Sequence, residues 1–175
     1  MLRYFAMDVF ISADDIQRRV RSMAQEIRRD HPDGVHLVCV LKGAFVFLAD
    51  LARELSGDAT LDFMAVSSYG TSTKSSGQVQ VLKDLDTALE GRDVIIVEDI
   101  VDTGLTLHYL QDILRARAPR NLRTACLLSK PSRRKIDVKV EYIGFTIEDK
   151  FVVGYGLDYG EQYRNLPYIA VIDGP

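Results

Sequence analysis

The run V-I-I-V-E-D-I-V-D-T-G-L-T at residues 94–106 constrains the fold more than any other part of this sequence. Its first four residues are β-branched, which suits a strand that is buried on both faces. From residue 105 to 116, apolar residues recur at the spacing of an amphipathic helix. The polar block therefore stands where a strand gives way to a helix, and in open α/β sheets that crevice is a common place for ligands.

The polar block combines three carboxylates with one glycine and two threonines. Backbone N–H groups and hydroxyls around Gly104 can cradle a phosphate. Carboxylates repel a phosphate unless cations intervene, so we expect Glu98 and Asp99 to face sugar hydroxyls or Mg²⁺, with Asp102 as a candidate base. A plainer alternative stays open at this point. Many α/β proteins end a strand in acids that cap the next helix, and response-regulator receiver domains carry an acidic pair after a hydrophobic strand.

The rest of the chain alternates between strand and helix patterns. Ser12 is a candidate helix cap, followed by a helical pattern to about residue 29. A second helix is predicted over residues 44–55. Strands are predicted over residues 35–41, 59–66, 78–82, 122–128, 142–145, 151–155 and 168–172. We therefore predict a single α/β domain over residues 1–175, with a central, mostly parallel sheet flanked by helices.

Composition excludes several classes of protein. The formal net charge of -3 gives no general attraction to nucleic acid, and no apolar run is long enough to span a membrane. Cys39 and Cys126 each lie in an apolar strand-like run and are predicted to be buried free thiols. The first eight residues are too short and too soon acidic for a signal peptide, so we expect a cytoplasmic protein. There is no P-loop motif, and the glycines after residue 153 do not match the dinucleotide fingerprint.

Several motifs together resemble those of type I phosphoribosyltransferases, and most of all the hypoxanthine-guanine enzymes. The block E-D-I-V-D-T-G-L-T resembles the signature for phosphoribosyl pyrophosphate (PRPP). The resemblance continues through L-K-G-A at 41–44, S-Y-G at 68–70, S-K-P at 129–131 and K-F-V-V-G-Y-G-L-D-Y at 150–159. It implies the type I phosphoribosyltransferase fold, in which the N-terminal residues and the C-terminal part would form a small hood subdomain beside the sheet.

The resemblance also implies a function. A protein of this family would be a Mg²⁺-dependent enzyme of purine salvage that transfers the 5-phosphoribosyl group from PRPP to hypoxanthine, and to guanine. The products would be IMP or GMP and pyrophosphate, and the enzyme would be a homodimer or homotetramer. Two alternatives stay open, namely a xanthine-preferring enzyme and a nucleotide-sensing RNA-binding regulator of the same fold. The regulator needs a basic face with interleaved aromatics, which the net charge does not favour. We interpret the cluster Arg133-Arg134-Lys135 as a solvated turn or a subunit contact.

The resemblance finally assigns residues to roles. Asp102 is the candidate general base for a purine ring nitrogen. PRPP and the nucleotide are expected to contact Lys42, Gly43, Ser68, Tyr69, Glu98, Asp99, Asp102, Thr103, Gly104, Leu105, Thr106 and Arg164. The purine is expected at Lys130, Lys150, Phe151, Val152 and Asp158, with Lys130 against the 6-oxo group and Phe151 stacked on the ring. The expected metal ligands are Glu98, Asp99 and Asp158.

Two features of the backbone are also expected from the resemblance. One is a cis peptide bond between Leu41 and Lys42, in the loop that follows a predicted strand. The other is a mobile loop over residues 67–77, which is rich in Ser, Thr and Gly. Such a loop would close over the site and exclude water, which could otherwise hydrolyse the activated sugar.

Overall fold

A computed structural model describes residues 7–68 and 79–172 of the chain. Its main sheet has six strands in the order β4-β3-β2-β5-β6-β7. These are β2 (Val35–Leu41), β3 (Ala59–Ser68), β4 (Val79–Lys83), β5 (Asp93–Val101), β6 (Asn121–Ser129) and β7 (Tyr142–Thr146). Neighbouring strands are parallel except β3 and β4, which pair antiparallel at one edge. The structure thus has the predicted central, mostly parallel sheet.

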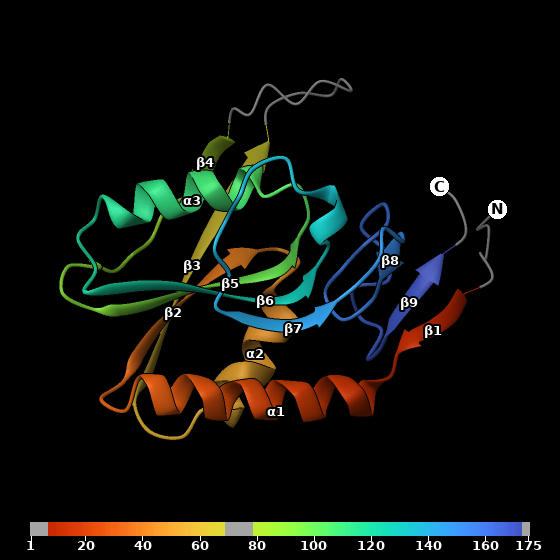
Figure 1. Ribbon diagram of the computed structural model, residues 1–175, viewed down its shortest axis with the longest axis horizontal. Coiled ribbons are helices and arrows are strands. Elements are labelled where there is room, and N and C mark those ends of the chain that lie inside the picture. The colour runs from red at the N-terminus through yellow and green to blue at the C-terminus, as the bar shows by residue number, and fades with distance from the viewer. Residues whose placement is uncertain (1–6, 69–78, 173–175) are drawn as a thin grey trace.

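Helices cover both faces of this sheet. The helices α1 (Ala13–Asp30) and α2 (Phe45–Glu54) lie on one face, and α3 (Leu105–Arg115) lies on the other (Figure 1). Successive strand residues point to opposite faces, so Leu37 and Ile95 pack in the core with α1 and α2, whereas Val38 and Ile96 pack with α3. The central strands β2, β5 and β6 are buried on both faces, which explains why they read as continuous apolar runs rather than as alternating ones.

A second, three-stranded sheet forms from the two ends of the described chain. It has the order β1-β9-β8, with β1 (Met7–Ile11), β9 (Ile169–Ile172) and β8 (Val152–Val153) paired antiparallel. It stands beyond the end of the main sheet toward which β6 and β7 run (Figure 1). The strand predicted over residues 151–155 is shorter than expected, because Gly154, Tyr155 and Gly156 all have positive φ and turn the chain.

The two cysteines are buried free thiols, as predicted. Burial, with the nearby Glu98 carboxyl adding to it, raises the pKa of Cys39 and of Cys126 to about 12, so neither is a ready nucleophile. Within residues 7–68 and 79–172, no helix combines the length and the apolar character that crossing a membrane requires.

Candidate active site

Strand β5 continues past the acidic pair to Val101, so Glu98 and Asp99 lie within the strand rather than after it. Glu98 is only 7 % exposed. Burial, with the charge of Asp99 adding to it, raises the pKa of Glu98 well above its ordinary value. Burial likewise raises the pKa of Asp99 to about 6, although the N–H of Ile100 donates to its carboxylate at 2.7 Å. Two neighbouring carboxyls whose charge is penalised in this way are candidates for binding a cation or hydroxyl donors.

The loop between β2 and α2 passes directly over Asp99. A Cβ on Gly43 would stand 1.7 Å from Oδ2 of Asp99, so only glycine permits this approach. The peptide between Leu41 and Lys42 is cis, as expected. A Cβ on Gly156 would in turn stand 2.1 Å from the carbonyl oxygen of Gly43. Three backbone segments that are distant in sequence therefore meet beside the carboxylate of Asp99.

Arg164 joins this meeting point from the C-terminal part of the chain. Its Nη2 lies 3.1 Å from both the Asp158 and the Glu161 carboxylates, and its Nη1 donates to the Gly156 carbonyl at 2.8 Å. The Nε of Arg164 is buried and has no acceptor among the described residues. Lys42 extends to the same place, with Nζ 2.8 Å from Glu161. The cationic side chains of Arg164 and Lys42 thus lie near Asp99, and the buried Nε–H of Arg164 is available to donate to a ligand anion.

Beyond β5 the chain encloses a cavity of about 100 Å³ at the start of α3. Its walls are Glu98, Ile100, Val101, Asp102, Thr103, Gly104, Thr106 and Leu107. Gly104 is the N-cap of α3 with φ of +86°, and no acidic residue stands in the first turn of the helix. The hydroxyl of Thr103 accepts from the N–H of Leu105 at 3.4 Å. Uncapped N–H groups at a helix start, next to hydroxyls, suit a small anion such as a phosphate.

Lys130 follows β6 and is buried at the same edge of the sheet. Its side chain is 9 % exposed, and Nζ donates to the carbonyl oxygen of Lys150 at 2.7 Å. The ammonium also lies 3.5 Å from the Asp149 carboxylate. Lys150 thus meets Lys130 through its backbone, while its own ammonium lies over the Phe10 ring, 5.0 Å from the centroid. A buried ammonium with three donors can still offer one of them to a ligand.

The aromatic residue predicted to stack on a base lies next along the chain. Phe151 is 39 % exposed, and its ring meets that of Tyr159 edge-to-face with centroids 5.6 Å apart. The following residue, Val152, is buried in β8, where it pairs with Val171 of β9. Phe151 is therefore partly exposed, while the next residue along the chain is paired in the small sheet.

The cluster at residues 133–135 lies at an exposed turn, in agreement with the solvated turn predicted for it, but its two arginines also contact the end of β5. Arg134 is partly buried, and its guanidinium donates to the carbonyls of Val101 and Asp102 and to the hydroxyl of Ser129. Arg133 donates through Nε to the Asp102 carboxylate at 3.0 Å. No periodicity in the sequence marks these contacts, since they depend on a 3₁₀ turn, Pro131–Arg133, that folds the cluster back onto the end of β5.

Other predicted residues are only partly placed. Ser68 is the last residue of β3. Tyr69, with the rest of the predicted closing loop to residue 77, lies outside the described residues. Glu98, Asp99 and Asp158 do not form a closed metal cage, since no group of three or more acidic, His or Cys side chains in the described ranges could hold a metal ion alone.

The phosphoribosyl transferase domain family matches residues 12–160. This chain belongs to that family. The hypoxanthine-guanine phosphoribosyltransferase of Bacillus subtilis (strain 168) is 49 % identical over 173 residues, which are 98 % of this chain and 96 % of the relative. The corresponding enzyme of Mycobacterium avium is also 49 % identical, over 94 % of this chain and 85 % of its own length.

Solved structures agree with the sequence relatives. A hypoxanthine-guanine phosphoribosyltransferase from Bacillus anthracis superposes with a TM-score of 0.91 at 48 % identity, covering 95 % of this chain and 98 % of the other. A hypoxanthine phosphoribosyltransferase from Staphylococcus aureus gives a TM-score of 0.92 at 42 % identity, covering 95 % and 91 %. The type I phosphoribosyltransferase fold predicted from the motifs is thereby confirmed.

Proposed function

We propose that this protein is a Mg²⁺-dependent hypoxanthine-guanine phosphoribosyltransferase of purine salvage. It transfers the 5-phosphoribosyl group of PRPP to a 6-oxopurine and releases IMP or GMP and pyrophosphate. The observation that carries the proposal is the buried ammonium of Lys130 at the same sheet edge as the phosphate-sized cavity beside Gly104. An ammonium donates to a 6-oxo group, whereas it has no acceptor to offer a 6-amino group. The relatives named for hypoxanthine and guanine support the same substrate class.

PRPP would span the edge between these two features. The 5-phosphate enters the cavity at Thr103, Gly104 and Thr106, and the carboxyls of Glu98 and Asp99 bind the ribose hydroxyls. Pyrophosphate lies toward Arg164, which has the unfilled buried donor, and toward the backbone amides of Lys42 and Gly43. We assign further pyrophosphate contacts to Ser68 and Tyr69 from the family resemblance.

The donor set of this edge fits Mg²⁺. Glu98 and Asp99 supply hard oxygen ligands, their charge is penalised by burial, and neither forms an ion pair among the described residues. Asp158 is the third carboxylate that would hold an ion. Mg²⁺ commonly binds through one or two carboxylates, waters and substrate phosphates. When bound, Mg²⁺ neutralises charge on the pyrophosphate leaving group.

We assign Asp102 to the chemistry of the purine. Its carboxylate is 40 % exposed at the mouth of the cavity, and it accepts the proton that a ring nitrogen loses as the bond to ribose C1 forms. The bond from C1 to pyrophosphate breaks in the same process, which builds positive charge on the sugar. Phe151 stacks on the purine, the backbone of Val152 contacts its edge, and Lys130 holds the 6-oxo group.

The test is a steady-state assay with PRPP and Mg²⁺ against hypoxanthine, guanine, xanthine, adenine and uracil. We expect turnover with hypoxanthine and guanine and none with adenine or uracil. Preferential turnover of xanthine would transfer the assignment to a xanthine-preferring enzyme. No turnover with any base, together with tight nucleotide binding, would overturn the proposal in favour of an RNA-binding regulator of the same fold.

A homodimer or homotetramer is part of the proposal. Leu61 and Phe63 of β3 and Leu82 of β4 are 45, 36 and 64 % exposed. They lie on the sheet face opposite Met64 and Val81, whose side chains pack in the core under α3. An apolar strip at a sheet edge is a common subunit contact. Sedimentation of wild type and of Phe63→Ser tests it, with a smaller species expected for the variant. A cytoplasmic location remains a prediction that rests on the two reduced cysteines.

A further inference from the structure

Four alternately charged side chains form a row along one wall of the site. Asp102 accepts from Nε of Arg133 at 3.0 Å, and Nη1 of Arg133 lies 3.5 Å from Oδ2 of Asp149. The other oxygen of Asp149, Oδ1, lies 3.5 Å from Nζ of Lys130. The row therefore runs from the candidate base to the lysine assigned to the purine, and its two inner members, Arg133 and Asp149, have no role in the proposed chemistry.

Hydrogen bonds and a proline restrain the backbone that carries Arg133. Arg134, next to Arg133, donates to the carbonyl of Val101 at 2.6 Å and to the hydroxyl of Ser129 at 2.8 Å. These acceptors stand at the ends of β5 and β6, so Arg134 ties the two strand ends together. The 3₁₀ turn Pro131–Arg133 begins with a proline whose φ is fixed by its ring. The side chain of Arg133 therefore extends from a backbone segment whose conformation is restrained on both sides.

The row leaves each outer member with one free position. Arg133 engages only Oδ1 of Asp102, and Oδ2 has no partner among the described residues. Lys130 directs its ammonium to the Lys150 carbonyl and to Asp149, which leaves one of its three donors. One acceptor and one donor are thus presented at a set spacing, as a purine with a ring N–H and a 6-oxo group requires.

We propose that Arg133 and Asp149 are positioning residues that set the orientation of Asp102 relative to Lys130. The inference rests on the proposed function, because it concerns the purine half of that reaction. Neither residue needs to touch the substrate. Arg133 is 47 % and Asp149 is 52 % exposed, and ion pairs this open to water contribute little to stability. Their effect is therefore on catalysis rather than on folding.

The experiment compares Arg133→Met, Asp149→Asn and the double variant in steady-state assays with hypoxanthine and PRPP. We expect each single variant to lose about tenfold in kcat/KM for hypoxanthine, because a small misplacement of catalytic groups is costly. KM for PRPP and Tm stay near the wild-type values. The double variant should lose no more kcat/KM for hypoxanthine than the less active of the two single variants, because either substitution alone already breaks the row. Arg133→Lys keeps the charge but cannot donate through two nitrogens at once. We therefore expect its kcat/KM for hypoxanthine to lie between those of wild type and Arg133→Met.

Two neighbouring residues supply matched controls. Lys135→Met removes a positive charge two residues from Arg133, from an exposed side chain with no partner among the described residues. Glu148→Gln removes a negative charge next to Asp149, from a side chain that is 86 % exposed. Both controls retain wild-type kinetics if geometry, rather than net charge, is what the row provides.

The outcomes separate the two proposals. If wild type turns over hypoxanthine and Arg133→Met behaves like Lys135→Met, the positioning role is wrong while the enzyme assignment stands. If the losses of the single variants multiply in the double variant, the two residues act independently and the row is not a unit. If wild type turns over no base, the proposed function itself is wrong. Should Arg133→Met fold poorly, Asp149→Asn against Glu148→Gln carries the same test.

Discussion

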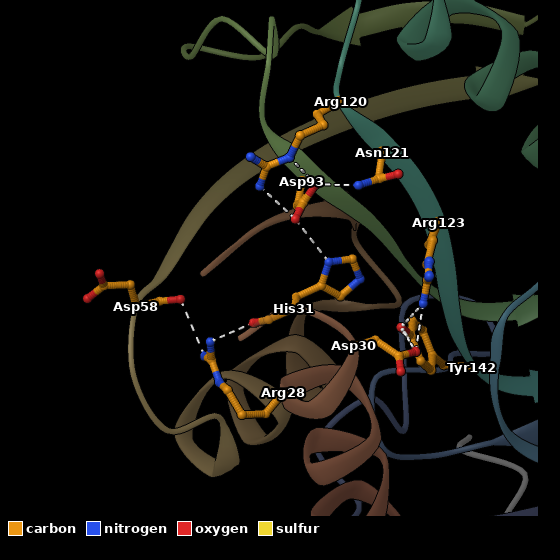
Figure 2. A network of polar contacts seen from close by, with 9 residues as sticks. All are labelled: Arg28, Asp30, His31, Asp58, Asp93, Arg120, Asn121, Arg123 and Tyr142. Atoms are coloured by element: carbon orange, nitrogen blue, oxygen red, sulfur yellow. Dashed lines mark hydrogen bonds and ion pairs between the residues drawn. The ribbon is translucent and has the colours of Figure 1, made fainter. Parts of the chain in front are cut away.

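Strand β5 has acidic residues at both ends, and their surroundings are opposite. At its start, Asp93 accepts from Nε and Nη2 of Arg120 at 2.9 and 2.8 Å, from Asn121 at 2.7 Å and from His31 at 3.3 Å. Hydrogen bonds from Arg120, with those of Asn121 and His31, hold the pKa of Asp93 well below its usual range. Figure 2 shows how these partners come from the end of α1 and the start of β6.

At the other end, burial raises the pKa values of Glu98 and Asp99, and no cation of the described residues forms an ion pair with either. The comparison separates two uses of a buried acid on one strand. Asp93 has its partners within the protein and ties α1 to the sheet, so its charge stabilises the fold. Glu98 and Asp99 lack such partners, so their charge destabilises the free protein and is available to a ligand. We therefore interpret the amino edge of the sheet as structural, and we propose that the carboxyl edge is the functional one.

The largest effect is expected just beyond the functional end. Asp102→Asn removes the proposed proton acceptor while keeping the shape of the side chain. We expect kcat to fall about 100-fold, a typical contribution of a general base, with PRPP affinity and Tm nearly unchanged. Steady-state kinetics with a calorimetric titration of PRPP measures both quantities. An unchanged kcat would remove Asp102 from the chemistry.

At the start of β5, a substitution of Asp93 should lower stability and leave kcat unchanged. Asp93→Asn removes the charge that Arg120 and His31 surround, and we expect a loss of about 2 kcal/mol in the free energy of unfolding at pH 7, with kcat unchanged. The pKa of Asp93 is lowered in the folded state, so its contribution is complete above the unfolded value near ~4 and is lost as the pH falls. The stability gap to wild type should therefore narrow between pH 5 and pH 3. Asp33→Asn, an exposed acid at the same edge, should show no such gap.

This contrast also marks what the sequence could reveal. The β-branched run before Glu98 and the apolar spacing after Gly104 are local patterns, so the strand, the helix and the acidic edge between them were predictable. The cis peptide between Leu41 and Lys42 was expected from the family resemblance. Each of these features belongs to a contiguous sequence motif, so it can be predicted without knowledge of the fold.

The missing part consists of contacts between distant segments. Arg133 and Arg134 looked like a solvated turn because charge clusters usually are, and only the fold brings them against the end of β5. The same holds for Asp93, whose partner His31 is 62 residues away. The extension of β5 through its acids was also not predicted, since Asp is a poor strand former.

A smaller effect of opposite sign is expected for Glu98→Gln. The amide removes a buried charge without a protein partner, so the free protein should gain about 1 kcal/mol in stability. The same change should lower kcat/KM for PRPP about tenfold, because a ligand of the sugar or of Mg²⁺ is weakened. Thermal unfolding without ligand, alongside kinetics, tests the pair of effects. Glu90→Gln, at an exposed glutamate, is the control, and a loss of stability in Glu98→Gln would contradict the division of the strand into two ends.

The smallest effect sharpens what holds the structural end. Arg120 is 58 % exposed, so Arg120→Met removes one partner of Asp93 from a place where water can replace it. We expect Tm to fall by only about 1 °C, since Asn121 and His31 still donate to the carboxylate. In an Asp93→Asn background the same change should have little further effect, because among the described residues the guanidinium of Arg120 donates its hydrogen bonds to Asp93. If Arg120→Met were as damaging as Asp93→Asn, Asp93 would depend on the exposed cation rather than on the hydrogen bonds from Asn121 and His31, and those two donors would not be what distinguishes this end of β5 from the end with Glu98.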